Sequence, residues 1–72
     1  MTLSIEDSAI AMNLAFNIDT GRLPLEFVAK DVAENWQDWK QIIAFWQQHA
    51  DKSQMLASIL KRLRLEIIFT YS

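Results

Sequence analysis

The chain has 72 residues and no cysteine, and Gly21, Pro24 and His49 are its only glycine, proline and histidine. The lack of cysteine excludes disulfides and thiolate zinc sites, and a single histidine argues against a histidine-based metal site within one chain. Scarce glycine and proline argue against a turn-rich β fold and favour long, uninterrupted elements. A domain this short buries only about 60% of its unfolded surface, so oligomerisation or very good packing must stabilise it.

Long apolar runs and an excess of charge of one sign are also missing. No apolar stretch approaches the roughly 18 residues that a membrane span needs. The first seven positions carry acids rather than a basic leader, which argues against a signal peptide. The formal net charge of −2 gives no general attraction to nucleic acid or to anionic lipid. We therefore expect a cytoplasmic protein without a membrane span.

Helical periodicity is the main feature that is present, and a hydrophobic fraction of 51% is too high for disorder. The first predicted helix covers about residues 5–18, with Ser4 as its N-cap. Gly21 suits the end of this helix, and Pro24 suits the start of the next one. One apolar face holds Ile5, Ala9, Met12 and Phe16, and a nearly opposite face holds Leu3, Ile10, Leu14 and Ile18. A helix that is apolar on two faces is usually sandwiched between neighbours.

The second predicted helix covers residues 24–48, because apolar residues recur there at three- and four-residue steps. An unbroken helix of this length would measure about 37 Å, whereas a compact chain of this size has a diameter near 30 Å. The alternative is therefore a break around Asn35. We favour the unbroken helix, because the three- and four-residue spacing of the apolar residues continues without a shift across Asn35.

The third predicted helix covers residues 52–67. Asp51 is its expected N-cap, with Gln54 three residues later in the capping-box position. Residues 66–71 are rich in β-branched and aromatic side chains, which prefer strands. A lone strand requires pairing with another chain. The tail is therefore either a continuation of the helix or a strand that pairs with a partner.

The most specific candidate site is a stripe of three tryptophans, Trp36, Trp39 and Trp46. On a helix their side chains fall within an arc of roughly 80°. Such a stripe is usually part of a core, although tryptophan is also enriched at protein interfaces. Phe27 and Phe45 lie on the polar face of the same segment, and Ile68 and Phe69 lie in the tail. These four apolar side chains also require a partner that covers them. The predicted protein interface therefore comprises Phe27, Trp36, Trp39, Phe45, Trp46, Ile68 and Phe69.

One basic cluster, formed by Lys52, Lys61, Arg62 and Arg64, has the charge to contact phosphates. No aromatic residues are interleaved with it to stack bases. The long, acidic segment after Gly21 also does not fit a helix-turn-helix. Nucleic-acid binding, or a transcription-related role, is therefore the alternative function.

Catalytic motifs are not found in the chain. His49 and Asp51 are interpreted as helix-end residues rather than as an acid–base pair. The sequence has no cysteine nucleophile, no glycine-rich phosphate loop and no metal-ligand spacing. We therefore predict no catalytic, cofactor-binding or metal-binding residue, and a protein that is not an enzyme.

The sequence thus predicts an all-α fold of two or three helices, arranged as an antiparallel hairpin or small bundle and completed by dimerisation. The expected function is that of a small adaptor or regulatory protein that binds another protein, with itself as one partner in a homodimer. The expected core comprises Ile5, Met12, Phe16, Val28, Val32, Trp36, Trp39, Ile43, Trp46, Leu56, Ile59, Leu60 and Leu63.

Overall fold

Four helices make up the fold in the computed structural model, which describes residues 3–71, with side chains as far as residue 68. The helices are α1 (Ile5–Asp19), α2 (Leu25–Glu34), α3 (Trp36–His49) and α4 (Gln54–Tyr71). Every regular element within residues 3–71 is a helix, which confirms the predicted all-α class. The predicted number of two or three helices is wrong, because the expected central helix is divided into α2 and α3.

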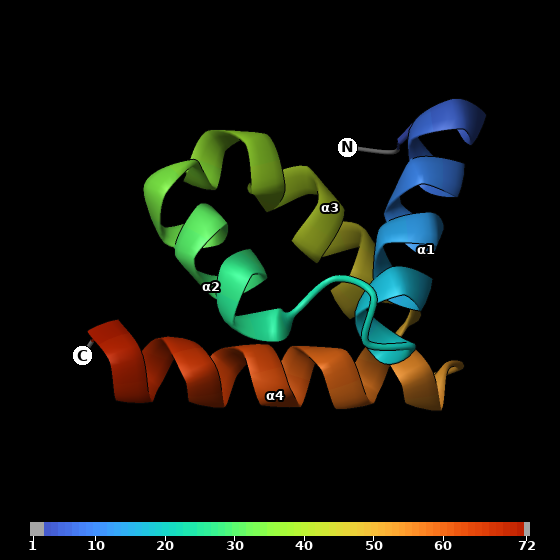
Figure 1. The fold of residues 1–72 in the computed structure, drawn as a ribbon. Coiled ribbons are helices and arrows are strands. Elements are labelled where there is room, and N and C mark those ends of the chain that lie inside the picture. Colours follow the sequence, from blue (N-terminus) through green and yellow to red (C-terminus); the bar gives the residue numbers. More distant parts are fainter. Residues whose placement is uncertain (1–2, 72) are drawn as a thin grey trace.

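The longest helix, α4, forms the base on which the other three helices rest (Figure 1). In Figure 1, α1 stands beside the N-terminal half of α4, and α2 lies over its C-terminal half. The third helix, α3, contacts α1, α2 and α4. The molecule measures 32 × 24 × 22 Å. An unbroken central helix of about 37 Å would exceed its longest dimension.

Asn35 marks the break between α2 and α3, with φ −131° and ψ 49°. The carboxylate of Asp31 joins the two sides of this break. One of its oxygens accepts a hydrogen bond from Asn35 Nδ2 at 2.8 Å, and the other accepts one from Trp39 Nε1 at 2.6 Å. The preference for an unbroken helix is therefore wrong, and the alternative argued from helix length is confirmed. The spacing of apolar residues in the sequence gives no sign of the break, because α2 and α3 both pack their apolar faces on the same core.

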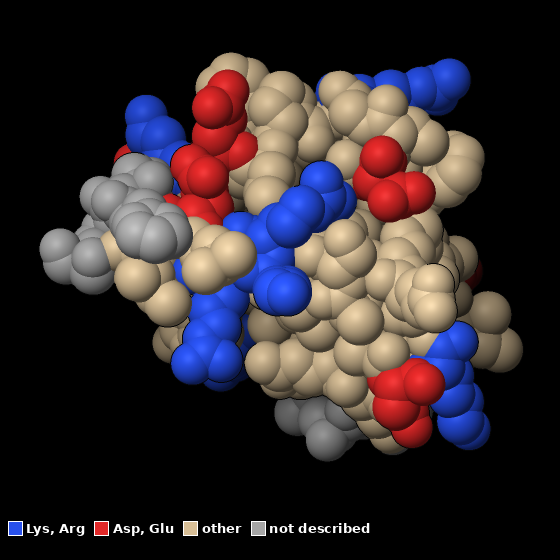
Figure 2. Space-filling view, turned by 90° about the horizontal axis from the view of Figure 1, so that it is seen from below, with Lys and Arg blue, Asp and Glu red and all other residues tan. Residues whose placement is uncertain are grey.

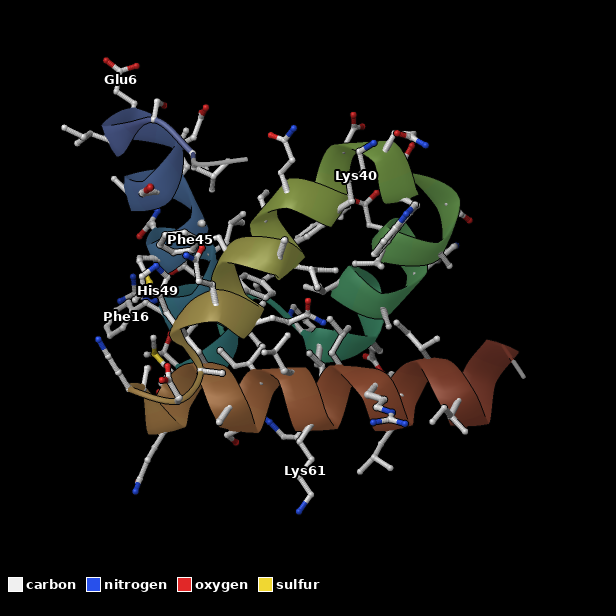
Figure 3. The ribbon with its side chains drawn as sticks, turned by 180° about the vertical axis from the view of Figure 1, so that it is seen from behind. Glu6, Phe16, Lys40, Phe45, His49 and Lys61 are labelled. Atoms are coloured by element: carbon white, nitrogen blue, oxygen red, sulfur yellow. The ribbon has the colours of Figure 1, made fainter. Side chains whose placement is uncertain are left out.

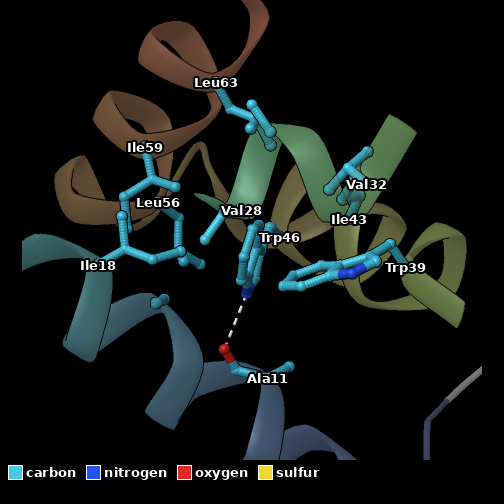
Figure 4. Close-up of a cluster of buried hydrophobic side chains, with 12 residues drawn as sticks. Ala11, Ile18, Val28, Val32, Trp39, Ile43, Trp46, Leu56, Ile59 and Leu63 are labelled. Carbon is cyan, nitrogen blue, oxygen red and sulfur yellow. Dashed lines mark hydrogen bonds between the residues drawn. The ribbon is translucent and has the colours of Figure 1, made fainter. Parts of the chain in front are cut away.

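The inner face of α1 differs from the predicted one. Its buried residues are Ala11, Ala15 and Ile18. The two alanines are one turn apart and have small side chains, so α1 approaches α3 closely enough for Trp46 Nε1 to donate a 2.9 Å hydrogen bond to the Ala11 carbonyl oxygen (Figure 4). The face of α1 that packs on the core is therefore the one with the smaller residues, because only small side chains let α1 come this close to α3. The predicted core residues that are exposed instead are Ile5, Met12 and Phe16.

The core lies where the four helices meet, and Trp46 is fully buried within it (Figure 4). The ring of Trp39 meets the ring of Trp46 edge to face, with centroids 6.1 Å apart and planes at 61°. Leu60 is only partly buried, and Trp36, also predicted to be core, is half-exposed. The buried residues of the core are Ala11, Ala15, Ile18, Val28, Ala29, Val32, Trp39, Ile43, Trp46, Leu56, Ile59 and Leu63.

Helix ends follow the local sequence at most positions. Ser4 caps α1, because its side chain accepts a 3.1 Å hydrogen bond from the backbone N–H of Asp7, as predicted. Gly21 has φ +80°, a left-handed conformation that glycine adopts without strain. At α4 the capping prediction is wrong. Ser53 rather than Asp51 accepts from the first turn, at 3.2 Å from the backbone nitrogen of Leu56.

The tail belongs to α4, which continues to Tyr71. Of the two predicted alternatives for residues 66–71, the helical one is therefore observed. The strand preference of the individual side chains is overridden, because the preceding turns of α4 are already fixed against α1, α2 and α3.

Candidate functional site

An open groove of about 680 Å³ lies where α2, α3 and the C-terminal half of α4 meet. Cavities of this volume are large enough for a small ligand or a short peptide segment. The lining is mainly aliphatic, with one tryptophan, one amide and two cations. The groove is lined by Val32, Trp36, Ile43, Gln47, Leu60, Lys61, Leu63, Arg64, Ile67 and Ile68.

Helical spacing places these residues at the groove. Leu60, Arg64 and Ile67 are four and three residues apart, so they follow one edge of α4. Trp36, Ile43 and Gln47 are seven and four residues apart, so they follow the facing edge of α3. Along α4 the groove extends from residue 60 to residue 68, which is about 12 Å or roughly two helical turns.

Trp36 is the member of the tryptophan stripe that remains accessible, with 49% of its surface exposed. Trp39 and Trp46 are buried, and their indole N–H groups already donate to Asp31 and to the Ala11 carbonyl oxygen. The stripe is therefore core at two of its three positions. Trp36 stands at its edge because it is the first residue of α3, directly after the break.

Positive charge lies beside the groove. The charged residues among those that line it are Lys61 and Arg64. Figure 2 looks onto α4 and shows lysine and arginine side chains gathered near the middle of this face. In Figure 3, Lys61 extends from α4 away from the body of the molecule. Lys61 is therefore at the edge of the groove, with its ammonium group in solvent.

The other residues of the predicted interface are dispersed. Ile68 lines the groove with Trp36, whereas Phe27 is exposed on α2 and is not among the lining residues. Phe45 is partly buried against the core, and its ring centroid lies 4.5 Å from that of His49 (Figure 3). The side chain of Phe69 lies outside the described residues. The structure thus brings Trp36 and Ile68 together and leaves the two phenylalanines of α2 and α3 apart.

The predicted basic cluster is exposed but extended. Lys52 lies in the turn before α4, and Lys61, Arg62 and Arg64 lie in the middle of α4. Nine residues separate Lys52 from Lys61, which corresponds to roughly 13 Å of helix. The cations of α4 therefore form a compact group, and Lys52 stands apart from it.

A second apolar surface, which sequence analysis assigned to the core, lies on the outside of α1. We call the exposed residues Ile5, Ala9, Met12 and Phe16 the α1 stripe. Ile5 has 90% of its surface exposed. Contiguous exposed apolar residues, unlike isolated ones, often mark an interaction surface.

Chemically reactive arrangements are not seen in the part of the chain that the structure describes. There, no three histidine, aspartate or glutamate side chains lie close enough together to hold a metal ion. The buried side chains of the same part are all hydrophobic. None of its helices is long and apolar enough to cross a membrane. The groove and the α1 stripe are therefore the surfaces on which a functional argument can be built.

Comparison of the chain with protein families, with curated proteins and with solved structures finds no match. The geometry and charge of the groove and of the α1 stripe are therefore the basis for a proposed function.

The groove is not apparent in the sequence because its two edges come from distant segments. Val32, Ile43 and Leu63 were predicted as core and are buried, but they also form the groove floor. The signal in the sequence that relates to the groove is the mixture of apolar and basic residues on α4, where Leu60 and Ile67 flank Lys61 and Arg64.

Proposed function

We propose that this protein is a non-enzymatic interaction module that binds an amphipathic helix in the groove. The observation that carries the proposal is a two-turn apolar groove that exposes Trp36 and Ile68 and carries Lys61 and Arg64. Helix-in-groove recognition uses apolar anchors at steps of three and four residues. A bound helix with acidic residues beside its anchors would complement the two cations.

Two further aspects belong to this proposal. The module acts as an adaptor or regulatory protein, because a groove of this kind captures a segment without reacting with it. It also associates with itself, because a chain of 72 residues with two apolar surfaces gains stability when they are covered. The dimer expected from the sequence is thus part of the proposed function.

A titration with designed peptides tests the groove directly. The first probe is a synthetic 18-residue amphipathic helix with leucine anchors and glutamate on its flanks, unrelated to this chain. The matched probe replaces each glutamate by lysine. We expect saturable backbone amide shift changes in the ¹H–¹⁵N NMR spectrum, centred on Trp36 and residues 60–68, with the acidic peptide only. Equal binding of both peptides, or shift changes elsewhere, would contradict the proposal.

Variants and a competing ligand complete the test. Arg64→Glu combined with Ile68→Ser should abolish peptide binding, because it reverses one charge and removes one apolar anchor of the groove. Leu65→Ser is the matched control, because Leu65 is about as exposed as Ile68 (45% against 42%) but does not line the groove. Duplex DNA at about 50 mM salt tests the alternative function. DNA binding that survives Ile68→Ser while the peptide does not bind would favour the basic cluster of α4 instead.

A further inference from the structure

The α1 stripe and the groove are two apolar surfaces that the described residues leave uncovered. The stripe lies on a helix whose charged residues are all acidic, whereas the charged residues of the groove are cations. We infer that the groove of one copy binds the α1 stripe of a second copy. The inference rests on the proposed function, since it assumes that the groove takes an amphipathic helix. It goes further by naming the helix, which makes this chain both the receptor and the ligand.

The α1 stripe has the form that the groove requires. Ile5, Ala9, Met12 and Phe16 are separated by four, three and four residues, which aligns them along one side of α1. The stripe is roughly 16 Å long. The groove follows α4 for about 12 Å, so it can take three of the four positions at once. The remaining end would lie over the exposed Trp36 or beyond Ile68.

Charge favours this pairing over the two symmetric ones. The charged residues of α1 are Glu6, Asp7 and Asp19, all of them acidic. Glu6 and Asp19 lie near the two ends of the stripe, whereas Asp7 is on the opposite side of the helix. The charged residues of the groove are Lys61 and Arg64. Two grooves facing each other would bring their cations together. Two α1 stripes packed antiparallel would bring the acids of one α1 towards those of the other. Like charges in contact weaken association, and only the α1–groove contact joins opposite charges.

The contact must form between molecules. α1 is fixed to its own core through Ala11, Ala15 and Ile18, which turns the α1 stripe outward. α1 also lies beside the N-terminal half of α4, whereas the groove lies along the C-terminal half (Figure 1). A contact between two different surfaces either closes as a reciprocal pair or continues as a chain of copies. Either outcome satisfies the inference, because the α1–groove contact is the same.

Complementation between two variants is the decisive experiment. The α1 variant carries Ile5→Ser and Phe16→Ser, and the groove variant carries Arg64→Glu and Ile68→Ser. All four side chains are exposed, so we expect both variants to keep the helical circular dichroism of the natural chain. Light scattering on a sizing column should give more than the 8.4 kDa of one chain for the natural protein. Each variant alone should weaken association by about 30-fold or more.

The two variants mixed in equal amounts should associate again. The α1 variant retains an intact groove and the groove variant retains an intact α1 stripe, so each mixed pair has one natural contact. We expect a species near 17 kDa, twice the 8.4 kDa chain, at concentrations where each variant alone stays monomeric. A contact between identical surfaces would not recover in this way. Failure of the mixture to associate would therefore overturn the inference.

Two matched substitutions control for the loss of exposed apolar surface. Ile10→Ser is the control on α1, because Ile10 and Phe16 are equally exposed at 53% but Ile10 lies off the stripe. Leu65→Ser is again the control on α4. Both controls should associate like the natural chain. Equal weakening by controls and variants would contradict the assignment of the contact, as would a natural chain that is monomeric at about 1 mM, where contacts worth roughly 4 kcal/mol are already half-formed.

Binding of the acidic peptide to the groove tests the proposed function separately from self-association. A monomeric chain whose groove still binds the acidic peptide would refute self-recognition and the dimer, and would leave helix binding by the groove standing. A chain that neither associates nor binds the peptide would refute both. If the inference holds, the acidic peptide should compete with self-association and reduce the mass of the natural protein towards 8.4 kDa.

Discussion

Replacing each tryptophan by phenylalanine measures how the stripe is divided between core and surface. At Trp46 the substitution removes a buried indole N–H and leaves the Ala11 carbonyl oxygen without its 2.9 Å donor. Loss of such a partner costs about 1–3 kcal/mol. The smaller ring also leaves a void in the core, which costs about 1 kcal/mol more. We therefore expect the free energy of unfolding to fall by about 2–4 kcal/mol.

This loss is large for so small a domain. At about 0.05–0.15 kcal/mol per residue, a chain of 72 residues has a stability of roughly 4–11 kcal/mol. With a denaturant slope of about 1 kcal/mol per molar urea, Trp46→Phe should lower the urea midpoint by about 2 M or more. Circular dichroism at low, fixed protein concentration is the suitable assay, because it does not depend on tryptophan emission.

The other two tryptophans provide the internal comparison. Trp39→Phe removes a hydrogen bond to the carboxylate of Asp31 near the surface, so we expect a loss of about 1–2 kcal/mol. Trp36→Phe acts on a half-exposed side chain and should change stability by less than about 0.5 kcal/mol. Equal losses at all three positions, or a loss at Trp46 below about 0.5 kcal/mol, would refute the assignment of Trp46 to the centre of the core.

Three further predictions concern helix ends, and urea unfolding measures each. Ser53→Ala should cost about 1 kcal/mol because Ser53 caps α4, whereas Asp51→Ala should have little effect; the reverse order would restore Asp51 as the cap. Gly21→Ala should cost about 1 kcal/mol through its φ of +80° alone, since an added Cβ would meet no atom within 4 Å; an unchanged midpoint would contradict this. Asp31→Ala should cost about 1–3 kcal/mol, because it removes the acceptor of both Asn35 and Trp39; a loss no larger than that of Asn35→Ala would show that the bond to Trp39 contributes nothing.

Sequence periodicity predicted the helical class and most of the core of α2, α3 and α4. Val28, Val32, Ile43 and Leu56 were expected to be buried and are buried. Period 3.6 is informative here because each of these helices has one apolar face. The same signal could not resolve the break at Asn35, because a kinked helix can keep both halves facing one core. The length of the unbroken helix relative to the size of the domain was the better guide.

For α1, periodicity gave two apolar faces and no means of choosing between them. The choice depends on how closely α1 can approach Trp46, and therefore on the size of Ala11 and Ala15 rather than on hydrophobicity. Large side chains at those two positions would hold α1 away from the Trp46 indole, and the hydrogen bond to Ala11 could not form. Helix packing thus selects the face with the smallest residues where a tryptophan must fit. Counting apolar side chains alone selects the wrong face.

The apolar pattern of residues 24–48 does not reveal the groove, because the break at Asn35 creates one of its edges. In an unbroken helix over residues 24–48, Val32 and Trp36 would be consecutive members of one continuous stripe. The break instead makes Trp36 the first residue of α3 and leaves it half-exposed beside α4. The Asp31 carboxylate, by holding Asn35 and Trp39, therefore supports both the turn between α2 and α3 and the position of Trp36.

The exposure of the α1 stripe follows from the same packing that completes the core. Once Ala11 and Ala15 are set against Trp46, the opposite side of α1 faces solvent, and Ile5, Met12 and Phe16 with it. Burying these three side chains in another molecule would remove apolar surface from water at about 25 cal/mol per Å², and would leave the monomer core unchanged. Self-association through the α1 stripe, as we infer it, would therefore add stability to a small domain without requiring any rearrangement of its fold.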